Sequence, residues 1–264
     1  MPEKTPAKKS LGQHFLVDLS CCRRIVRLAE IEATDQVIEI GAGTGQLTQV
    51  LLQAAGHVTA IEFDRDLVRR LQERWPQRAD NRLSIVQGNV LNLRWSELLR
   101  RTPVKIVGNL PYNISTRIIK QMIEIENRFH SFTFMIQKEV AARVLAKPGD
   151  RDYGYFSILV EAHFQRVSGF DVGAESFRPS PGVRSHVMKL IPAQAPPPLA
   201  RARRFDALLR RAFRHRRKTL WNNLRSASFQ SARLSDAFAQ CGVERDSRPG
   251  QVTLEQYLCL ARVL

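Results

Sequence analysis

The sequence predicts an α/β protein, with a doubly wound parallel sheet followed by a small all-helical domain. Short apolar runs alternate with amphipathic stretches through the first part of the chain, which is typical of repeated βα units. A glycine cluster, "GAGTG", directly follows the first of these runs. After the proline-rich segment "IPAQAPPPLA", Ile191 to Ala200, only helical patterns remain.

The elements follow from runs of strand length bounded by turn residues and from apolar residues at helical spacing. The predicted strands are Gln36–Ile40, His57–Glu62, Leu83–Gln87, Val104–Gly108 and Phe132–Gln137, with a further strand at Val183–Ile191. The predicted helices include Leu47–Ala55, Asp66–Trp75, Ser115–Glu124 and Lys138–Leu145.

The proline-rich segment sets the predicted domain boundary, because its prolines favour an extended, semi-rigid backbone. We expect a first domain at 1–192 with a flexible basic N-terminal arm, a linker at 193–200, and a basic helical domain at 201–264.

Composition narrows the class of protein. The chain has 264 residues, 44% of them hydrophobic, and contains neither a signal-peptide pattern nor an apolar run long enough to span a membrane. We therefore expect a soluble cytoplasmic protein. The net charge of +16 favours a polyanionic partner. Nucleic acid is preferred over a membrane surface, because the basic tail lacks a broad apolar face for lipid.

The four cysteines, Cys21, Cys22, Cys241 and Cys259, are not spaced as CxxC. We expect small buried thiols in a reducing compartment rather than a disulfide or a metal site, and no metal elsewhere.

The glycine cluster places Gly41, Gly43 and Gly45 between a strand and a helix, which is more than a tight turn needs. A dinucleotide fingerprint would require a third glycine where Gln46 stands, so pyrophosphate binding is the weaker interpretation. Glu62 ends the next strand, where a carboxylate can bind both hydroxyls of a ribose. With Glu39 before the loop, the pattern resembles the class I methyltransferases, a Rossmann-like fold that binds S-adenosylmethionine.

Two further polar segments follow strands. Asn89 comes after the third strand, where that class commonly contacts the adenine amine, although a turn asparagine is the alternative. After the fourth strand, Asn109, Leu110, Pro111 and Tyr112 resemble the (N/D)-P-P-Y motif of enzymes that methylate an amine on a planar ring. A strand-ending turn is again the alternative.

The residue types in the tetrapeptide suit that chemistry. An adenine amine is a poor nucleophile, because its lone pair is delocalised into the ring. The Asn109 side-chain oxygen and the Leu110 carbonyl can hold its two hydrogens, Pro111 can orient that carbonyl, and Tyr112 can stack on the base.

Five stretches together resemble the KsgA-type ribosomal small-subunit RNA adenine dimethyltransferases, and the similarity extends over nearly the whole chain. They are "KKSLGQHFLVD", "EIGAGTGQLT", "VGNLPYNIS", "ESFRPSPGVRSHV" and "FRHRRKTLWNNL". The resemblance implies dimethylation of two adjacent adenosines in a hairpin loop near the 3′ end of 16S ribosomal RNA, within the immature small subunit.

The resemblance also implies roles for individual residues. Cofactor contacts carry over to His14, Leu16, Gly41, Glu62, Asn89 and Asn109, although His14 replaces a frequent Asn and Asn89 a frequent Asp. Phe177 would sandwich the flipped base against Tyr112. Lys8 and Lys9 would belong to a basic arm that closes over cofactor and RNA.

The segment "RRFDALLRRAFRHRRKTL", Arg203 to Leu220, predicts an amphipathic helix with a basic face. No acidic residue lies between Ala207 and Leu224, so phosphate contact is preferred over a solvated surface. Arg216 falls on the inner side, and His215 has no assigned role. The predicted phosphate contacts are Arg210, Arg211, Arg214, Arg217 and Lys218.

Three functions stay open from the sequence. The first is the RNA adenine dimethyltransferase, and the second is a ribosome assembly factor that acts mainly by binding RNA. The third is a resistance-type enzyme acting on 23S ribosomal RNA. In each case we expect a monomer.

Overall fold

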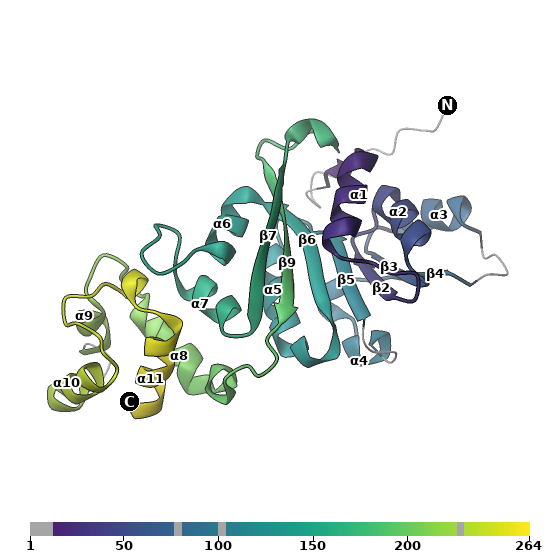
Figure 1. Ribbon diagram of the computed structural model, residues 1–264. Helices are drawn as coiled ribbons and strands as arrows, with labels where there is room; N and C mark the ends of the chain where they lie inside the picture. Colours follow the sequence, from purple (N-terminus) through teal and green to yellow (C-terminus); the bar gives the residue numbers. More distant parts are fainter. Residues whose placement is uncertain (1–12, 77–80, 100–103, 226–229) are drawn as a thin grey trace. The chain divides into compact units, whose positions relative to one another are not determined.

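A computed structural model describes residues 13–76, 81–99, 104–225 and 230–264 (Figure 1). The predicted RNA contacts Lys8 and Lys9 lie outside these residues. Within the described part of the chain, no helix is both long enough and apolar enough to cross a membrane.

The main sheet has seven strands in the order β4-β3-β2-β5-β6-β9-β7. Strands β4, β3, β2, β5 and β6 run parallel, and β9 is antiparallel to β6. The predicted α/β class is therefore confirmed. The strands are β2 (Gln36–Ile40), β3 (His57–Glu62), β4 (Leu83–Gln87), β5 (Val104–Asn109), β6 (Ser131–Gln137), β7 (Phe164–Val172) and β9 (Ser185–Pro192).

The five parallel strands match the predicted ranges to within one residue at each end, whereas β7 was not predicted. The central strands are buried on both faces, since every residue of Val37–Ile40 and Ser131–Ile136 is buried. This burial on both faces is typical of parallel sheets covered by helices on each side.

Helices cover the two faces of the sheet. In Figure 1, α1 lies in front of the strands and α5 passes behind them. Along the chain, the helices before β7 are α1 (Leu19–Leu28), α2 (Gln46–Ala54), α3 (Arg65–Arg74), α4 (Trp95–Leu98), α5 (Ser115–Glu124), α6 (Lys138–Leu145) and α7 (Tyr155–Glu161). The helices after β9 are α8 (Arg203–Ala212), α9 (Leu220–Arg225), α10 (Ser231–Gln240) and α11 (Leu254–Val263).

A small second sheet holds the N-terminal segment. Strand β1 (Phe15–Leu16) pairs antiparallel with β8 (Phe177–Arg178), so that Phe15 lies opposite Arg178 and Leu16 opposite Phe177. The Val17 N–H also donates to the Ser176 carbonyl at 2.9 Å. This pairing fixes the chain just before α1.

The chain forms two compact units whose limits differ from the predicted domains. The first contains the described residues up to Ala141 together with Val167–Pro192, and the second contains Ala142–Arg166 together with Ala193–Leu264. Residues 142–166 join the helical unit because Tyr153 and Ile158 are buried among side chains of its helices. The predicted linker belongs to this unit as well, since Ala200 is buried in the same cluster.

The predicted basic helix is interrupted. Helix α8 ends at Ala212, and the chain makes a turn before α9 begins at Leu220. The Asn223 side chain stabilises this turn: its Oδ1 accepts from the His215 N–H at 3.1 Å, and its Nδ2 donates to the His215 and Thr219 carbonyls. These bonds satisfy backbone groups that a continuous helix would have paired internally.

The cysteine prediction is half right. Cys21 and Cys22 are buried free thiols, and burial raises the pKa of each to about 12. Cys241 and Cys259, however, form a disulfide with their Cα atoms 5.6 Å apart. The prediction was wrong there because the packing of α10 beside α11 brings two distant cysteines together.

Candidate functional site

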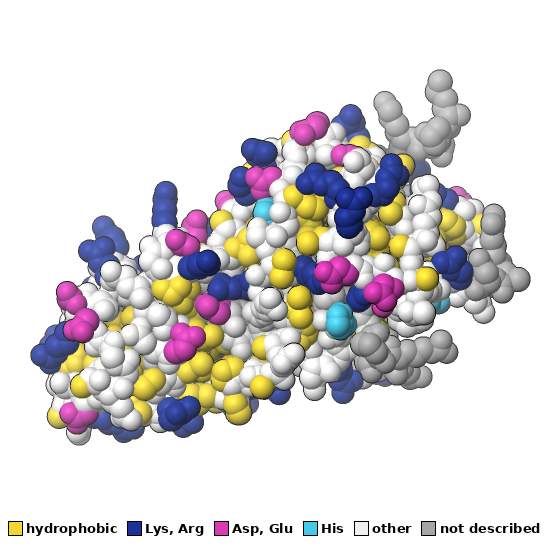
Figure 2. All heavy atoms as spheres, in the orientation of Figure 1, with side chains coloured by type: hydrophobic (Ala, Val, Ile, Leu, Met, Phe, Trp, Pro, Cys, Tyr) yellow, Lys and Arg dark blue, Asp and Glu magenta, His cyan; other side chains and the backbone are white. Residues whose placement is uncertain are grey.

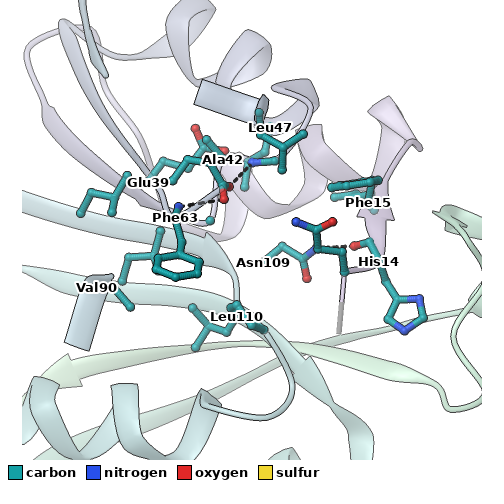
Figure 3. A pocket seen from close by; sticks show the side chains of 18 of the residues that line it. His14, Phe15, Glu39, Ala42, Leu47, Phe63, Val90, Asn109 and Leu110 are labelled. Carbon is teal, nitrogen blue, oxygen red and sulfur yellow. Dashed lines mark hydrogen bonds between the residues drawn. The ribbon is translucent and has the colours of Figure 1, made fainter. Parts of the chain in front are cut away.

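A cavity of about 280 Å³ opens where the parallel strands end. It lies at the topological switch point, because β2 and β5 are neighbours whose connections run to opposite sides of the sheet. Figure 3 shows its lining, to which the N-terminal segment also contributes. The lining residues used below are Gln13, His14, Phe15, Leu16, Glu39, Gly41, Gly43, Glu62, Phe63, Asn89, Val90, Asn109, Leu110, Pro111 and Tyr112.

The glycine loop after β2 forms one wall, and all three of its glycines have positive φ. At two of them a side chain would also lack space. At Gly41, with φ of 76°, an added Cβ would lie 3.2 Å from the Asn109 carbonyl. At Gly45, with φ of 84°, it would lie 2.6 Å from the Trp75 ring. Gly41 therefore lets two strand ends approach each other, and Gly45 lets α2 begin against α3.

Glu62 ties this loop to the end of β3. Its Oε2 accepts from the Gly43 N–H at 2.8 Å, and its Oε1 accepts from the N–H groups of Phe63 and Asp64 at 2.8 and 2.9 Å. Burial raises the pKa of this carboxyl, whereas the three backbone donors oppose the rise. The carboxylate is thus held at the cavity wall by the backbone, with lone pairs left to accept from a ligand.

Glu39 lies deeper, at 1% exposure. Its Oε2 accepts from the Thr48 hydroxyl at 2.6 Å, whereas its Oε1 has no partner within the described residues. Burial raises its pKa to about 7. An unpaired buried oxygen next to the cavity leaves an acceptor for a polar ligand group.

The ends of β3 and β4 add one polar and two apolar side chains. Asn89 accepts from the Leu91 N–H through Oδ1 at 3.0 Å, so its amide nitrogen remains as the donor. Phe63 is 55% exposed and Val90 is buried. Both line the cavity, and Figure 3 shows them near each other, where they offer apolar surface to a ligand.

Asn109 ends β5 and faces the N-terminal segment. Its Nδ2 donates to the His14 carbonyl at 3.2 Å, the contact drawn in Figure 3. This bond fixes the orientation of the amide and leaves Oδ1 as its acceptor. The Leu110 N–H donates to the Met135 carbonyl at 3.1 Å, which holds the next peptide in place.

Tyr112 has defined partners for both its ring and its hydroxyl. The hydroxyl is 2.7 Å from the Oγ of Ser185, which is fully buried, and burial raises the phenol pKa. Its ring lies beside the His14 imidazole, with centroids 5.7 Å apart, and His14 Nδ1 donates to the Pro179 carbonyl at 2.8 Å. The raised pKa keeps this phenol protonated near neutral pH, so it is not poised to act as a base.

The structure contradicts the expectation for Phe177. Its side chain is 0% exposed and packs in a core cluster with Leu16 and Ile25, and it is not part of the cavity lining. The family resemblance placed this ring against the target base, but pairing of β8 with β1 directs it into the core. The aromatic ring found beside Tyr112 is that of His14.

The structure brings the other predicted cavity residues together, except that Gly45 supports the loop from behind without lining the cavity. Gln13, Phe15, Phe63 and Val90 were missed. Phe63 had a signal in the sequence, as an aromatic directly after the acidic end of a strand. The place of Phe15 depends on the β1–β8 pairing, which no local pattern reveals.

The predicted phosphate contacts in the second unit lie on α8 and the turn after it. Arg210 pairs with Asp206 at 2.6 Å and lies over the Tyr155 ring. Arg214, Arg217 and Lys218 are exposed in the turn. Arg216 is exposed as a residue, but its guanidinium donates to the Arg151 and Tyr153 carbonyls at 2.7 Å, so it makes structural contacts. Arg211 is exposed at the end of α8.

No group of three or more His, Cys, Asp or Glu side chains that could hold a metal ion occurs in the described ranges. The cavity instead offers carboxylate and amide groups beside apolar walls, which suits an organic ligand.

Comparisons with known proteins agree with this geometry. The family described as "Ribosomal RNA adenine dimethylase" matches residues 4–264. A ribosomal RNA small subunit methyltransferase A from Lactobacillus johnsonii is 40% identical over 98% of this chain and 90% of its own length. One from Laribacter hongkongensis is 38% identical, covering 96% of this chain and 94% of its own.

A crystal structure is also similar. That of a dimethyladenosine transferase from Plasmodium falciparum superposes with a TM-score of 0.80 at 27% identity, covering 94% of this chain and 96% of its own.

Proposed function

This chain belongs to the ribosomal RNA adenine dimethylase family, and we propose that it dimethylates adenosine N6 amines from S-adenosylmethionine. The substrate is a pair of adjacent adenosines in a hairpin loop near the 3′ end of 16S ribosomal RNA. The observation that carries this proposal is the position of Asn109, which lines one cavity with Glu62 and the glycine loop. A methyl donor and an amine acceptor can therefore meet there.

The residues present fit the cofactor. Glu62 offers carboxylate oxygens to the ribose hydroxyls, and Phe63 and Val90 offer apolar faces to the adenine. Asn89 accepts from the Leu91 N–H through its oxygen, so its NH2 group is the donor that would bind a ring nitrogen of that base. When bound, S-adenosylmethionine would supply an electrophilic sulfonium methyl group. The glycine loop, the unpaired Oε1 of Glu39 and the segment from His14 to Leu16 enclose the remainder.

The tetrapeptide acts on the target amine. Asn109 Oδ1 and the Leu110 carbonyl accept its hydrogens and draw the nitrogen toward tetrahedral geometry, which frees the lone pair for in-line attack. Pro111 restricts the backbone that aims the carbonyl, and Tyr112 provides the stacking surface. Catalysis is then positioning together with preset dipoles, and the acidic alkylated amine releases its proton without a strong base.

The basic turn of the second unit supports RNA binding. Arg214, Arg217 and Lys218 are exposed, and Asn223 fixes the backbone that presents them. With Arg210 and Arg211 they form a phosphate-binding surface, and Lys8 and Lys9 add charge from the N-terminal arm.

Replacing Arg214, Arg217 and Lys218 with alanine should reduce the salt dependence of RNA binding by about 2 in the log–log slope. R203A/R204A/R262A, which removes equal charge elsewhere in this unit, should leave the slope unchanged. An unchanged slope in the first variant would show that the turn does not contact RNA phosphates.

The other two candidate functions are less well supported. A factor acting only by binding RNA would not need Asn109, Glu62 and Tyr112 around one cavity. The curated relatives are named for the small subunit, which argues against a 23S substrate. We further propose that the protein acts as a cytoplasmic monomer on immature small subunits.

The function is tested by incubating the protein with labelled S-adenosylmethionine and unmethylated small subunits, then analysing nucleosides. We expect two labelled dimethyladenosines per subunit, and no labelling of large-subunit RNA. Label confined to large-subunit RNA, or the absence of methylated adenosine, would overturn the proposal.

A further inference from the structure

One side of α1 carries an arginine face, defined as Arg23, Arg24 and Arg27. All three are exposed, and the segment from Leu19 to Ala29 contains no acidic residue. Among the described residues, no carboxylate forms an ion pair with any of the three. Figure 2 shows Lys and Arg side chains gathered where Figure 1 places α1. Helices that only face solvent usually pair such charges with Glu or Asp.

The orientation of this face is fixed by the opposite side of the helix. Cys22, Ile25 and Ala29 are each 0% exposed and pack on the sheet. Arg24 is further held by its guanidinium, which lies 3.7 Å from the centroid of the Phe170 ring. The helix therefore cannot rotate its arginines inward, and their spacing is preset.

The nearest acid on β7 does not offset this charge. Asp171, next to Phe170, binds Lys138 Nζ at 2.6 Å and His186 Nδ1 at 2.7 Å. These two partners lower its carboxyl pKa to about 2. Its negative charge is already compensated, so the arginine face keeps an attractive potential for a polyanion.

The helix that carries the arginine face begins close to the cavity, because α1 starts three residues after Leu16, which lines it. Phe15 lines the cavity and lies opposite Arg178, an exposed residue. Two residues after β1, the Asp18 carboxylate caps α1 by accepting from the Ser20 N–H at 2.8 Å, and it binds Ser176 Oγ at 3.3 Å. A ten-residue helix is about 15 Å long, so the arginines lie within that distance of its capped end.

We propose that the arginine face binds phosphates of the double-stranded stem next to the target loop, so that the stem docks on α1 while the loop base enters the cavity. This inference rests on the proposed function, since it takes the substrate to be a hairpin. A rigid helix with preset guanidinium groups suits a duplex, whose phosphates are regularly placed and are read by shape. Arg178 extends the same contact to the cavity rim.

The test uses the full chain and two RNA probes, a hairpin with adjacent adenosines in its loop and a single strand carrying the loop alone. In R23A/R24A/R27A, the salt slope for the hairpin should fall by about 2, and its KM should rise about tenfold at physiological salt. The kcat at saturating hairpin should be unchanged, and so should binding of the single strand. R23K/R24K/R27K keeps the charge and should restore most of the slope.

Control variants separate the possible causes. R69A/R128A removes exposed charge elsewhere in the same unit and should leave the hairpin slope unchanged. Thermal unfolding and S-adenosylhomocysteine binding should be unaffected in the triple alanine variant. The docking proposal would be overturned if the triple alanine variant kept the full salt slope for the hairpin, or if its slope fell equally for the single strand. In either case the unsubstituted protein would still methylate, so the proposed function would stand. Failure of the unsubstituted protein to methylate small-subunit RNA would instead refute the proposed function.

Discussion

Replacing Asn109 with alanine should lower kcat for methyl transfer by about 10²–10³-fold, the usual loss when one preset polar partner of a transition state is removed. The carboxamide oxygen is the side-chain acceptor we assign to the target amine. Its orientation depends on donation from Nδ2 to the His14 carbonyl at 3.2 Å. Without that oxygen, one amine hydrogen has no side-chain acceptor, and the lone pair stays conjugated with the ring.

The Asn109→Asp variant distinguishes the role of the acceptor oxygen from that of the donor nitrogen. It keeps an oxygen toward the amine but loses the donor to His14, so we expect a smaller loss of about tenfold. Both rates are measured with saturating S-adenosylmethionine, because Asn109 is also a candidate cofactor contact. Asn127→Ala, an exposed asparagine before β6, serves as the control. Full methyl transfer by the folded alanine variant would remove Asn109 from the mechanism.

Local sequence was sufficient for the parallel strands that carry the site. Strands β2, β3, β4 and β5 are largely apolar runs that end at or just before Gly, Asn or Glu, and β2 and β5 are almost wholly buried, which leaves little polar signal to confuse the pattern. The polar residues that follow these runs therefore converge by topology alone. This is why the sequence predicts one site for Glu62 and Asn109, which line the same cavity.

Long-range pairing explains most of what the sequence did not reveal. Strand β7 lies at the sheet edge, and its buried and exposed residues follow no regular period. Strands β1 and β8 have two residues each and exist only because distant segments meet. The role expected for Phe177 came from the family resemblance and was wrong for a related reason, because pairing with the distant Leu16 places its ring in the core.

The helical unit shows how side chains can override a helical pattern. The apolar spacing from Phe205 to Leu220 is compatible with one helix. The Asn223 carboxamide nevertheless binds backbone groups of His215 and Thr219, so the chain turns there. The Cys241–Cys259 pairing likewise depends on helix packing, which sequence spacing does not determine.

Glu62→Gln should weaken binding of S-adenosylhomocysteine by about 100-fold, measured by calorimetry. Glu62 accepts from Gly43 on one oxygen and from Phe63 and Asp64 on the other. A glutamine has a single acceptor oxygen, so its amide group must face one of these N–H donors. The variant therefore loses the tie to the glycine loop and a charged acceptor for the ribose, and each charge-assisted bond contributes about 1.5–3 kcal/mol.

This loss should not reflect unfolding. Burial raises the pKa of Glu62, which means that the fold disfavours its charge, and a neutral amide removes that cost. We therefore expect the thermal midpoint of the variant to stay near that of the unsubstituted protein, whereas its affinity for S-adenosylhomocysteine falls. Glu73→Gln makes the same chemical change on the exposed side of α3 and should bind normally. A folded Glu62→Gln variant with unchanged affinity would show that the ribose is held elsewhere, and the cavity would then need a different ligand.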